Sequence, residues 1–139
     1  MTGRADIGGQ KTVLIVEDHS LLRRVIREFL QSAFPGCSFQ EAADGATALA
    51  ACHAGLPQLV LMDISLPDAN GIELTSRLGT LYPGLRVIVV SHMSGEDYVQ
   101  QALAAGARAY VCQDDIFTDL VPAVAAVIGV PPATDMGAS

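Results

Sequence analysis

The sequence predicts an α/β fold with a single doubly wound sheet of five parallel strands. Three observations lead to this prediction. Five short apolar runs alternate with longer segments in which apolar residues recur every three or four positions, as in strands joined by crossover helices. The chain has 139 residues, half of them hydrophobic, which suffices for one domain with one core. No internal repeat or charge run divides the chain.

The first unit begins with residues 12–17, TVLIVE, a run of apolar or β-branched residues that ends in a carboxylate. We predict a helix over residues 21–30, ended by Pro35 and Gly36, because apolar residues recur there at helical spacing. The residues expected to share its apolar face are Leu21, Leu22, Val25, Ile26, Phe29 and Leu30.

The second unit begins with the weakest of the five strands, residues 37–42, in which polar and apolar residues alternate. Such alternation indicates a half-buried strand, and we expect it at an edge of the sheet. Asp44 then stands at the capping position of a helix of small residues, 45–54, which Gly55 and Pro57 close.

The third and fourth units contain the most apolar strands, residues 58–63 and 85–91. The fourth is apolar almost throughout, which predicts a central place in the sheet. Between these strands, Asn70 with Glu73 three residues later resembles a capping box, for a helix that runs to about Leu78.

The fifth unit completes the fold. Ser94 with Asp97 predicts the start of a helix that ends at Gly106, and residues 107–112 form the fifth strand. Pro122 falls within the first two turns of the last helix, so this helix either starts late or bends there. Its apolar stripe consists of Ile116, Leu120, Val121, Val124, Val127 and Ile128.

The predicted domain covers residues 11–129. Residues 1–10 and 130–139 are rich in polar, glycine, proline or other small residues, so we expect flexible tails there. Right-handed crossovers place the carboxyl ends of all parallel strands at one edge of the sheet, where ligands bind in such folds.

Three carboxylates are expected at that edge. Glu17 and Asp18 end the first strand, Asp63 ends the third, Ser91 ends the fourth and Gln113 follows the fifth. Without a cation, neighbouring carboxylates repel and raise one another's pKa values. Mg²⁺ takes few carboxylates and keeps water ligands, so it suits a shallow edge site better than Ca²⁺. Glu17 or Asp18 alone would be explained by a favourable position near the positive end of the first helix dipole. The occurrence of three carboxylates at one sheet edge favours a metal site.

Four segments carry a resemblance to a known family: VLIVEDH, LVLMDISLPDANGIEL, VIVVSHM and ALAAGARAYV. In order and spacing they resemble the receiver domains of two-component response regulators over nearly the whole predicted domain. The EDH and GARAY segments are most similar to regulators of the LuxR/FixJ/NarL type, in which a DNA-binding half regulates transcription. The resemblance implies the flavodoxin-like receiver fold and a role in phosphorelay signal transduction.

The resemblance also implies roles for the residues at the edge. Asp63 would accept a phosphoryl group from a sensor histidine kinase or a phosphotransfer protein. Glu17, Asp18 and Asp63 would hold Mg²⁺ together with the backbone carbonyl of Ser65. A carboxylate is a competent nucleophile toward phosphorus when a metal neutralises its surroundings.

Two further residues would carry the switch. By the same resemblance, the Ser91 hydroxyl would bind a phosphoryl oxygen, and the Tyr110 ring would turn inward. Together these movements would reshape a protein-interaction face formed by the last strand and its flanking helices.

The chain departs from the family at Gln113, where receiver domains carry a lysine. The three carboxylates exceed the charge of one Mg²⁺ by a single negative charge, which a lysine cancels and Gln113 does not. Lys11 is the only lysine in the chain and begins the first strand, ~20 Å from the acid pair. Arg23 and Arg24 are nearest to the pair in sequence, but a solvated helix face is the simpler interpretation. We therefore expect atypical handling of phosphate.

Two other classes of function fit the sequence less well. A phosphatase that used Asp63 as nucleophile would need an acid two residues later, where Ser65 stands, and a dinucleotide-binding fold would need a glycine-rich turn after the first strand. We therefore expect a signalling domain and no enzyme. A receiver-like interaction module that works without phosphate remains the alternative, because the lysine is missing.

Composition limits the partners and the compartment. The net charge of −7 and the absence of a basic run argue against direct nucleic-acid binding by this chain. No stretch reaches the roughly 18 apolar residues that span a bilayer. The three cysteines show no C-x-x-C spacing, which favours a reducing compartment, so we expect a cytoplasmic location. Homodimerisation through helix faces is left open.

Overall fold

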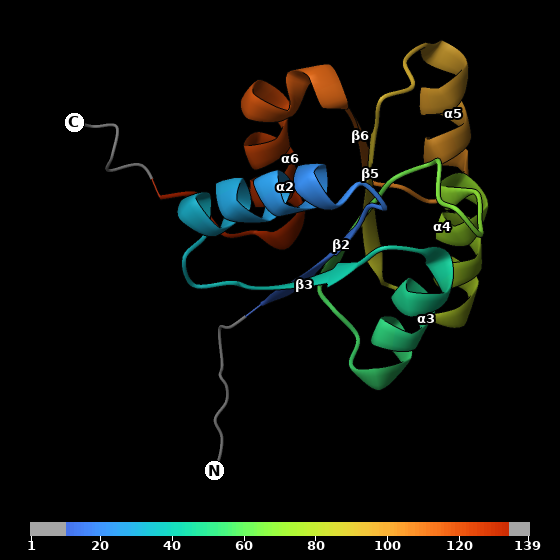
Figure 1. Cartoon of the computed structure of the whole chain (residues 1–139), viewed down its shortest axis with the longest axis horizontal. Coiled ribbons are helices and arrows are strands. Elements are labelled where there is room, and N and C mark those ends of the chain that lie inside the picture. Colours follow the sequence, from blue (N-terminus) through green and yellow to red (C-terminus); the bar gives the residue numbers. More distant parts are fainter. Residues whose placement is uncertain (1–10, 134–139) are drawn as a thin grey trace.

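The structure is a computed structural model that describes residues 11–133. Five parallel strands form one sheet in the order β3-β2-β4-β5-β6. Helices cover both faces of this sheet (Figure 1). The predicted fold class is confirmed. The strands are β2 (Thr12–Val16), β3 (Ser38–Ala42), β4 (Leu59–Met62), β5 (Arg86–Ser91) and β6 (Ala109–Cys112).

The helices divide into two layers. In Figure 1, α2 and α6 lie on one face of the sheet, and α3, α4 and α5 lie on the other. A short 3₁₀ helix η1 and a π-helix η2 precede α6. The bounds are α2 (Ser20–Ala33), α3 (Gly45–Ala54), α4 (Gly71–Leu81), α5 (Glu96–Ala104), η1 (Gln113–Asp115), η2 (Ile116–Leu120) and α6 (Val121–Ile128).

The places of two strands in the sheet were predicted from their composition. The alternating strand β3 lies at an edge, as expected. The apolar strand β5 is interior, with β4 and β6 as neighbours, but β4 holds the middle place. An interior parallel strand is buried on both faces, which is why these strands read as continuous apolar runs.

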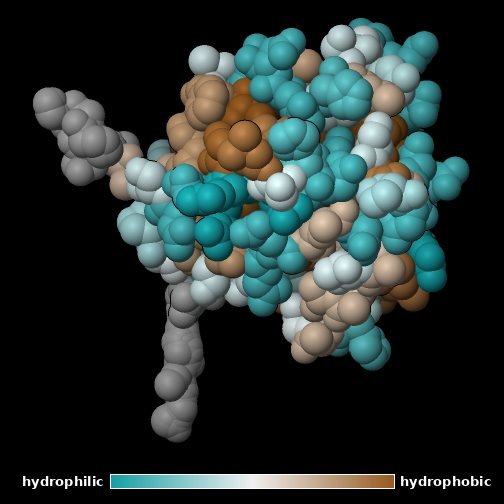
Figure 2. Space-filling view, viewed as in Figure 1, coloured by the Kyte–Doolittle hydropathy of each residue, from teal (hydrophilic) through white to brown (hydrophobic). Residues whose placement is uncertain are grey.

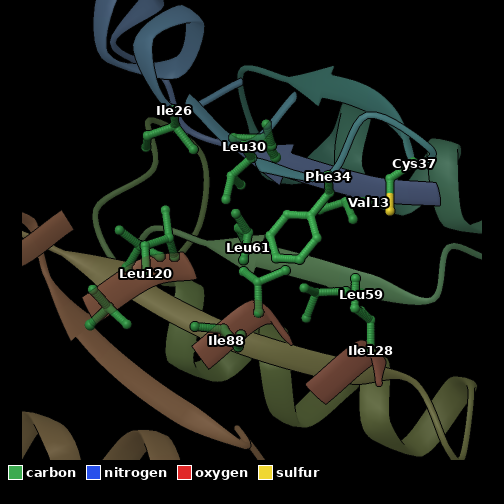
Figure 3. Packing of buried hydrophobic residues seen from close by; sticks show 14 of the residues in the cluster. Val13, Ile26, Leu30, Phe34, Cys37, Leu59, Leu61, Ile88, Leu120 and Ile128 are labelled. Atoms are coloured by element: carbon green, nitrogen blue, oxygen red, sulfur yellow. The ribbon is translucent and has the colours of Figure 1, made fainter. Parts of the chain in front are cut away.

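The core has a layer on each side of the sheet. Val13 and Ile15 pack toward α2 and α6, whereas Leu14 and Val16 pack toward α3 and α4. Figure 3 shows Phe34 of the first layer among the side chains of the strands beneath it. Full burial of an aliphatic side chain contributes about 1.5–3 kcal/mol each, so the two layers supply the main stabilisation of the sheet that carries the strand ends.

Two predicted helix starts agree with the structure. The Asp44 carboxylate accepts a hydrogen bond from the Thr47 amide at 2.7 Å and caps α3. The Asn70 side chain accepts bonds from the amides of Ile72 and Glu73, at 2.8 and 3.1 Å, and caps α4. Each side chain satisfies amides that the first turn of a helix leaves unpaired.

The predicted start of α5 was wrong. The cap position is Gly95 and not Ser94, and no side chain caps this helix. Gly95 has a φ of 121°, a conformation that a residue with a Cβ atom rarely adopts. Glu96 and Asp97 lie in the first turn, where their charges suit the positive end of the helix dipole.

The α-helical part of the last helix starts late, beside its proline. Residues of η2 adopt π-helical geometry, and α6 begins at Val121 with Pro122 in its first turn. An amide is not needed there, so proline is tolerated.

The apolar face of α2 is only partly buried. Ile26 and Leu30 are buried, whereas Leu21 is 63% exposed and Val25 is 36% exposed. Six apolar residues span a wider arc of the helix than its contact with the sheet covers. Part of the stripe therefore faces outward.

The chain leaves the domain along the end of α2. The amide of Ala133 donates to the carbonyl of Ala33 at 2.7 Å. The expected N-terminal tail, residues 1–10, lies outside the described residues, and so do residues 134–139 of the expected C-terminal tail. The predicted domain bounds, residues 11–129, therefore stay a prediction. Among the described helices, none is long and apolar enough to cross a membrane.

Candidate functional site

The sheet brings the acids of two separate strands together. Strands β2 and β4 are neighbours, with Val16 opposite Met62, so the residues that follow them emerge side by side. The ladder continues one step further, because the amide of Asp63 donates to the carbonyl of Val16 at 3.1 Å. One carboxylate oxygen from each of Glu17, Asp18 and Asp63 lies within 4.8 Å of the other two.

The acids of this cluster differ in their surroundings. Glu17 and Asp63 are each only 4% exposed, whereas Asp18 is exposed. The pKa of Glu17 is raised to about 7, chiefly by burial and also by the nearby charges of Asp63 and Asp18, while the hydrogen bond from the His19 amide opposes the rise. Burial likewise raises the pKa of Asp63, although amides of Ser65 and Ile64 donate to its carboxylate.

One atom in the cluster lacks a partner. The Oδ1 atom of Asp63 is buried and has no hydrogen-bond partner among residues 11–133. A buried polar atom without a partner costs free energy, and a bound cation would remove that cost. Three carboxylates offer oxygen ligands of the type that hard divalent cations prefer. The donor set therefore fits a divalent metal ion.

The cluster opens into a cavity of about 510 Å³, called the edge cavity below. Its volume leaves room for an ion with water ligands and a small anionic group beside the acids. The residues that line the edge cavity are Glu17, Asp18, His19, Leu22, Asp63, Ser65, His92 and Gln113.

The loop after Asp63 is held close to the site. The Gly71 amide donates a hydrogen bond to the carbonyl of Ile64 at 2.7 Å. A Cβ atom on Gly71 would overlap the carbonyl oxygen of Asp63 and lie 2.9 Å from the Cα atom of Ile64. Only glycine therefore permits this close approach of the two backbone segments.

A second contact holds the other side of this loop. The Asp68 carboxylate accepts hydrogen bonds from the amides of Gly45 and Ala46, at 2.7 and 3.0 Å, at the start of α3. The positive end of the helix dipole favours a carboxylate there. The role of Asp68 at the start of α3 was not predicted from the sequence, because Asp44 already accounted for the cap of that helix.

Ser91 and Tyr110 contact the same residue from two strands. The buried Ser91 hydroxyl oxygen accepts a hydrogen bond from the Met93 amide at 3.1 Å. The Tyr110 hydroxyl donates to the Met93 carbonyl at 2.5 Å. Neither Ser91 nor Tyr110 is among the described residues that line the edge cavity, whereas Gln113 is.

Two histidines near the acids have specific contacts. The His19 side chain caps α2 by accepting from the Leu22 amide at 3.2 Å, and its own amide donates to Glu17 at 3.0 Å. His92 lines the edge cavity, and its positive charge when protonated lowers the pKa of Asp63.

The two arginines nearest to the acid pair differ. Arg24 has a side chain 68% exposed and pairs with Glu28 at 3.2 Å on the surface of α2, as expected of a solvated face. The side chain of Arg23 is only 16% exposed, and its Nε lies 2.7 Å from Glu41. Its Nη1 donates to the carbonyl of Glu17 at 2.6 Å. Arg23 therefore lies beside the acid cluster and outside the edge cavity.

Comparisons with known proteins agree with this fold. Residues 13–124 match the family described as response regulator receiver domain. The transcriptional activator protein ExaE of Pseudomonas putida is 38% identical over 99 residues, which cover 71% of this chain and 46% of that protein. The chain spans about half the length of the curated relatives it matches.

Solved structures resemble this one over most of their length. A LuxR-family two-component response regulator from Aurantimonas sp. SI85-9A1 has 28% identity and a TM-score of 0.81, with 88% of this chain and 89% of that chain covered. A chain from the CheX–CheY–BeF3–Mg²⁺ complex of Borrelia burgdorferi has 26% identity and a TM-score of 0.77, with 84% and 88% covered. The chain belongs to the response regulator receiver domain family and is a signalling domain of two-component systems.

Proposed function

We propose that this receiver domain accepts a phosphoryl group on Asp63 with Mg²⁺ bound beside it. The unpartnered Oδ1 of Asp63, buried among two further carboxylates, carries the proposal. Glu17, Asp18 and Asp63 would hold the ion, and Ser65, which lines the same cavity, would add its backbone carbonyl. A relative solved in a complex with Mg²⁺ and BeF3 supports the choice of ion.

The chain's own residues prepare the carboxylate for phosphoryl transfer. An Asp63 oxygen would attack phosphorus, a P–O bond would form, and the P–N bond to a phosphohistidine of the donor would break, so that the imidazole leaves with a proton. Mg²⁺ would neutralise charge on the acids and the phosphoryl oxygens. The amides of Ser65 and Ile64 orient the carboxylate, and burial limits its hydration.

The response to phosphate would run through Met93. The Ser91 hydroxyl, now bonded to the Met93 amide, would instead donate to a phosphoryl oxygen. Loss of that contact would free the loop before α5, and Tyr110, bonded to the Met93 carbonyl, would follow. The surface formed by β6 and α5 would then change shape, which is how a local charge produces a change in partner binding.

The neutral side chain at position 113 would weaken this switch. Gln113 lines the edge cavity and offers an amide donor, but it adds no positive charge to the site. Charge-assisted hydrogen bonds are about twice as strong as neutral ones. We therefore propose slower phosphorylation or lower phosphoryl occupancy than a lysine would give.

The donor would be a histidine kinase or a phosphotransfer protein that docks beside the edge cavity. Figure 2 shows an apolar area over α2 and the segment that leads into α6. The exposed apolar side chains on these elements are Leu21, 63% exposed on α2, and Phe117, 68% exposed on η2, which packs edge-on against Phe29 at 5.0 Å between ring centroids. Exposed apolar areas of this kind mark protein interaction sites. Self-association through the same area is the competing use.

A cytoplasmic location is part of the proposal. Such donors act in the cytoplasm, and a reducing compartment suits the cysteines of this chain. Cys37, Cys52 and Cys112 are all free thiols, and the first two are buried.

A second candidate is an interaction module that works without phosphate. Gln113 favours it, because the site lacks the cation that would balance a phosphoryl group. The intact cluster of Glu17, Asp18 and Asp63 argues for the first candidate, since the charge of Asp18 raises the pKa values of Glu17 and Asp63 without serving any interaction surface.

The experiment incubates the full chain with acetyl phosphate and Mg²⁺ and measures the intact mass and the modified peptide. We expect one phosphoryl adduct, located on Asp63 and absent from Asp63→Asn. Addition of EDTA should prevent it. An unmodified wild-type chain, tested in parallel with a receiver domain known to react, would exclude the phosphoacceptor role and leave the interaction module.

A further inference from the structure

We propose that Arg23 is a positioning residue for the metal site, a role that rests on the proposed function above. Arg23 does not line the edge cavity and so does not replace the missing lysine. It binds instead the peptide group that joins the two acids of the first strand. Through this contact, Arg23 would set how tightly the chain holds a divalent cation.

The contact acts on both acids at once. Arg23 Nη1 donates to the carbonyl of Glu17 at 2.6 Å, and that carbonyl belongs to the peptide unit between Glu17 and Asp18. Rotation of this peptide unit would turn the Asp18 side chain away from Glu17 and Asp63. A hydrogen bond from a charged donor to a carbonyl is stronger than one from a neutral donor, so it restrains that rotation.

The other side of the guanidinium group is anchored to the sheet. Arg23 Nε lies 2.7 Å from Oε1 of Glu41, which belongs to the edge strand β3. The Glu17 amide donates to the carbonyl of Ala42 on the same strand at 3.0 Å. The backbone of Glu17 is thus fixed at its amide by β3 directly, and at its carbonyl by β3 through Arg23.

Arginine suits this task better than lysine. The two acceptors, a carboxylate of β3 and a carbonyl at the end of β2, lie on different sides of the guanidinium group, at Nε and Nη1. A guanidinium group offers donors in a fixed planar fork, whereas an ammonium group is a compact charge on a flexible stem. With its side chain 16% exposed, Arg23 is also partly shielded from competing water.

The structure contains a matched control one helical turn away. Arg27 forms an ion pair with the same carboxylate from the same helix α2, with its Nε 3.1 Å from Oε2 of Glu41, although this Nε makes no hydrogen bond among the described residues. Its Nε, unlike Nη1 of Arg23, faces no carbonyl of the acid pair in the described hydrogen bonds. If only the ion pair between α2 and β3 mattered, replacement of Arg23 and replacement of Arg27 should change Mg²⁺ affinity to a similar extent.

The experiment measures Mg²⁺ binding by isothermal titration for the full chain and for the variants Arg23→Met and Arg27→Met. Residues that orient metal ligands typically change metal affinity by about 10- to 100-fold when replaced. We expect a loss in that range for Arg23→Met and a change of less than about 3-fold for Arg27→Met, with both variants folded by circular dichroism. Arg23→Lys should not restore the affinity, because it lacks the fork.

Several outcomes are separable. Unchanged Mg²⁺ affinity in folded Arg23→Met, or an equal loss in Arg27→Met, would overturn the positioning role. A wild-type chain that binds no Mg²⁺ would overturn the proposed metal site itself, and the positioning role with it. If Arg23→Met does not fold, the comparison of Arg23→Lys with Arg27→Lys replaces it, since lysine retains the charge and loses only the two-sided contact.

Discussion

Gly71 and Asp63 approach so closely that no side chain fits between their backbones. A Cβ atom on Gly71 would overlap the carbonyl oxygen of Asp63, and the Gly71 amide donates to the next carbonyl, that of Ile64, at 2.7 Å. The start of α4 is therefore joined to the end of β4 at the residue proposed to accept phosphate. This contact links the stability of the fold to the geometry of the site.

Replacement of Gly71 by alanine should strongly destabilise the protein. Because the obstacle is backbone, the loop after Asp63 must move, and we expect a loss of at least about 3 kcal/mol in the free energy of unfolding. Gly79 on the same helix is the control, because a Cβ atom added there would meet nothing within 4 Å among the described residues, apart from its chain neighbours and the backbone of its own helix. Gly79→Ala should stabilise α4 by up to about 1 kcal/mol. Urea unfolding of both variants tests this; equal effects would contradict it.

Much of the fold and of the acid cluster could be predicted from sequence. Interior parallel strands must be apolar on both faces, so β4 and β5 are visible as apolar runs. Parallel strands with right-handed crossovers bring their carboxyl ends to one edge, so the meeting of Glu17 with Asp63 follows from topology alone.

Contacts between distant polar residues could not be predicted in this way. Arg23 pairs with Glu41, 18 residues away, and Asp68 bonds to Gly45, 23 residues away. An arginine is equally common on a solvated helix, and an aspartate is equally common in an ordinary turn. The partner of Arg23 is therefore decided only by the packing of α2 on β3, and the partner of Asp68 only by the packing of the loop after Asp63 on α3. Similarly, helical periodicity placed Leu21 on the apolar side of α2 but did not reveal the width of the buried strip.

The second prediction concerns Asp68. Asp68→Ala removes the acceptor for two amides at the start of α3 and should lower the free energy of unfolding by about 1 kcal/mol, as loss of a helix cap does. Asp44 caps the same helix through Thr47. The double variant should therefore deviate from additivity, because both acids serve one helix end. Strictly additive effects in thermal unfolding would show that the two contacts are independent.

The third prediction concerns pH. In the metal-free protein, the pKa of Glu17 is raised from 4.5 to about 7, so the folded state binds a proton that the unfolded state releases. Stability from this group is full below pH 4.5 and is lost as pH rises toward about 7. In EDTA, wild-type stability should therefore fall relative to Glu17→Gln over this interval. Glu73→Gln, at an exposed position, should not alter the pH dependence.

The same proton competes with the metal. Mg²⁺ requires the ionised carboxylate, so its affinity should increase as pH rises through about 7. Titrations with Mg²⁺ on both sides of that pH measure this. An affinity that is constant across the interval would show that Glu17 is not a ligand.

The fourth prediction concerns the switch. Tyr110→Phe removes the hydroxyl that donates to Met93 and leaves the ring in place. Phosphoryl occupancy should stay near that of the wild-type chain, because Tyr110 does not line the edge cavity in the described structure. The amide of Met93 should exchange faster with solvent, measured by hydrogen exchange without phosphate. Unchanged exchange at Met93 would mean that the hydroxyl does not restrain this loop.

The last prediction tests the missing charge. Gln113→Lys places a cation in the edge cavity, where three carboxylates outweigh one Mg²⁺ by a single negative charge. A charge-assisted bond is about twice as strong as the neutral bond of an amide, so steady-state phosphoryl occupancy with acetyl phosphate should rise. Thr118→Lys adds the same charge at an exposed position of η2, and it should change occupancy little because surface charges are screened by salt. If both variants raise occupancy equally, net charge and not the site accounts for the effect. If Gln113→Lys leaves occupancy unchanged, the absent lysine does not limit phosphorylation in this domain.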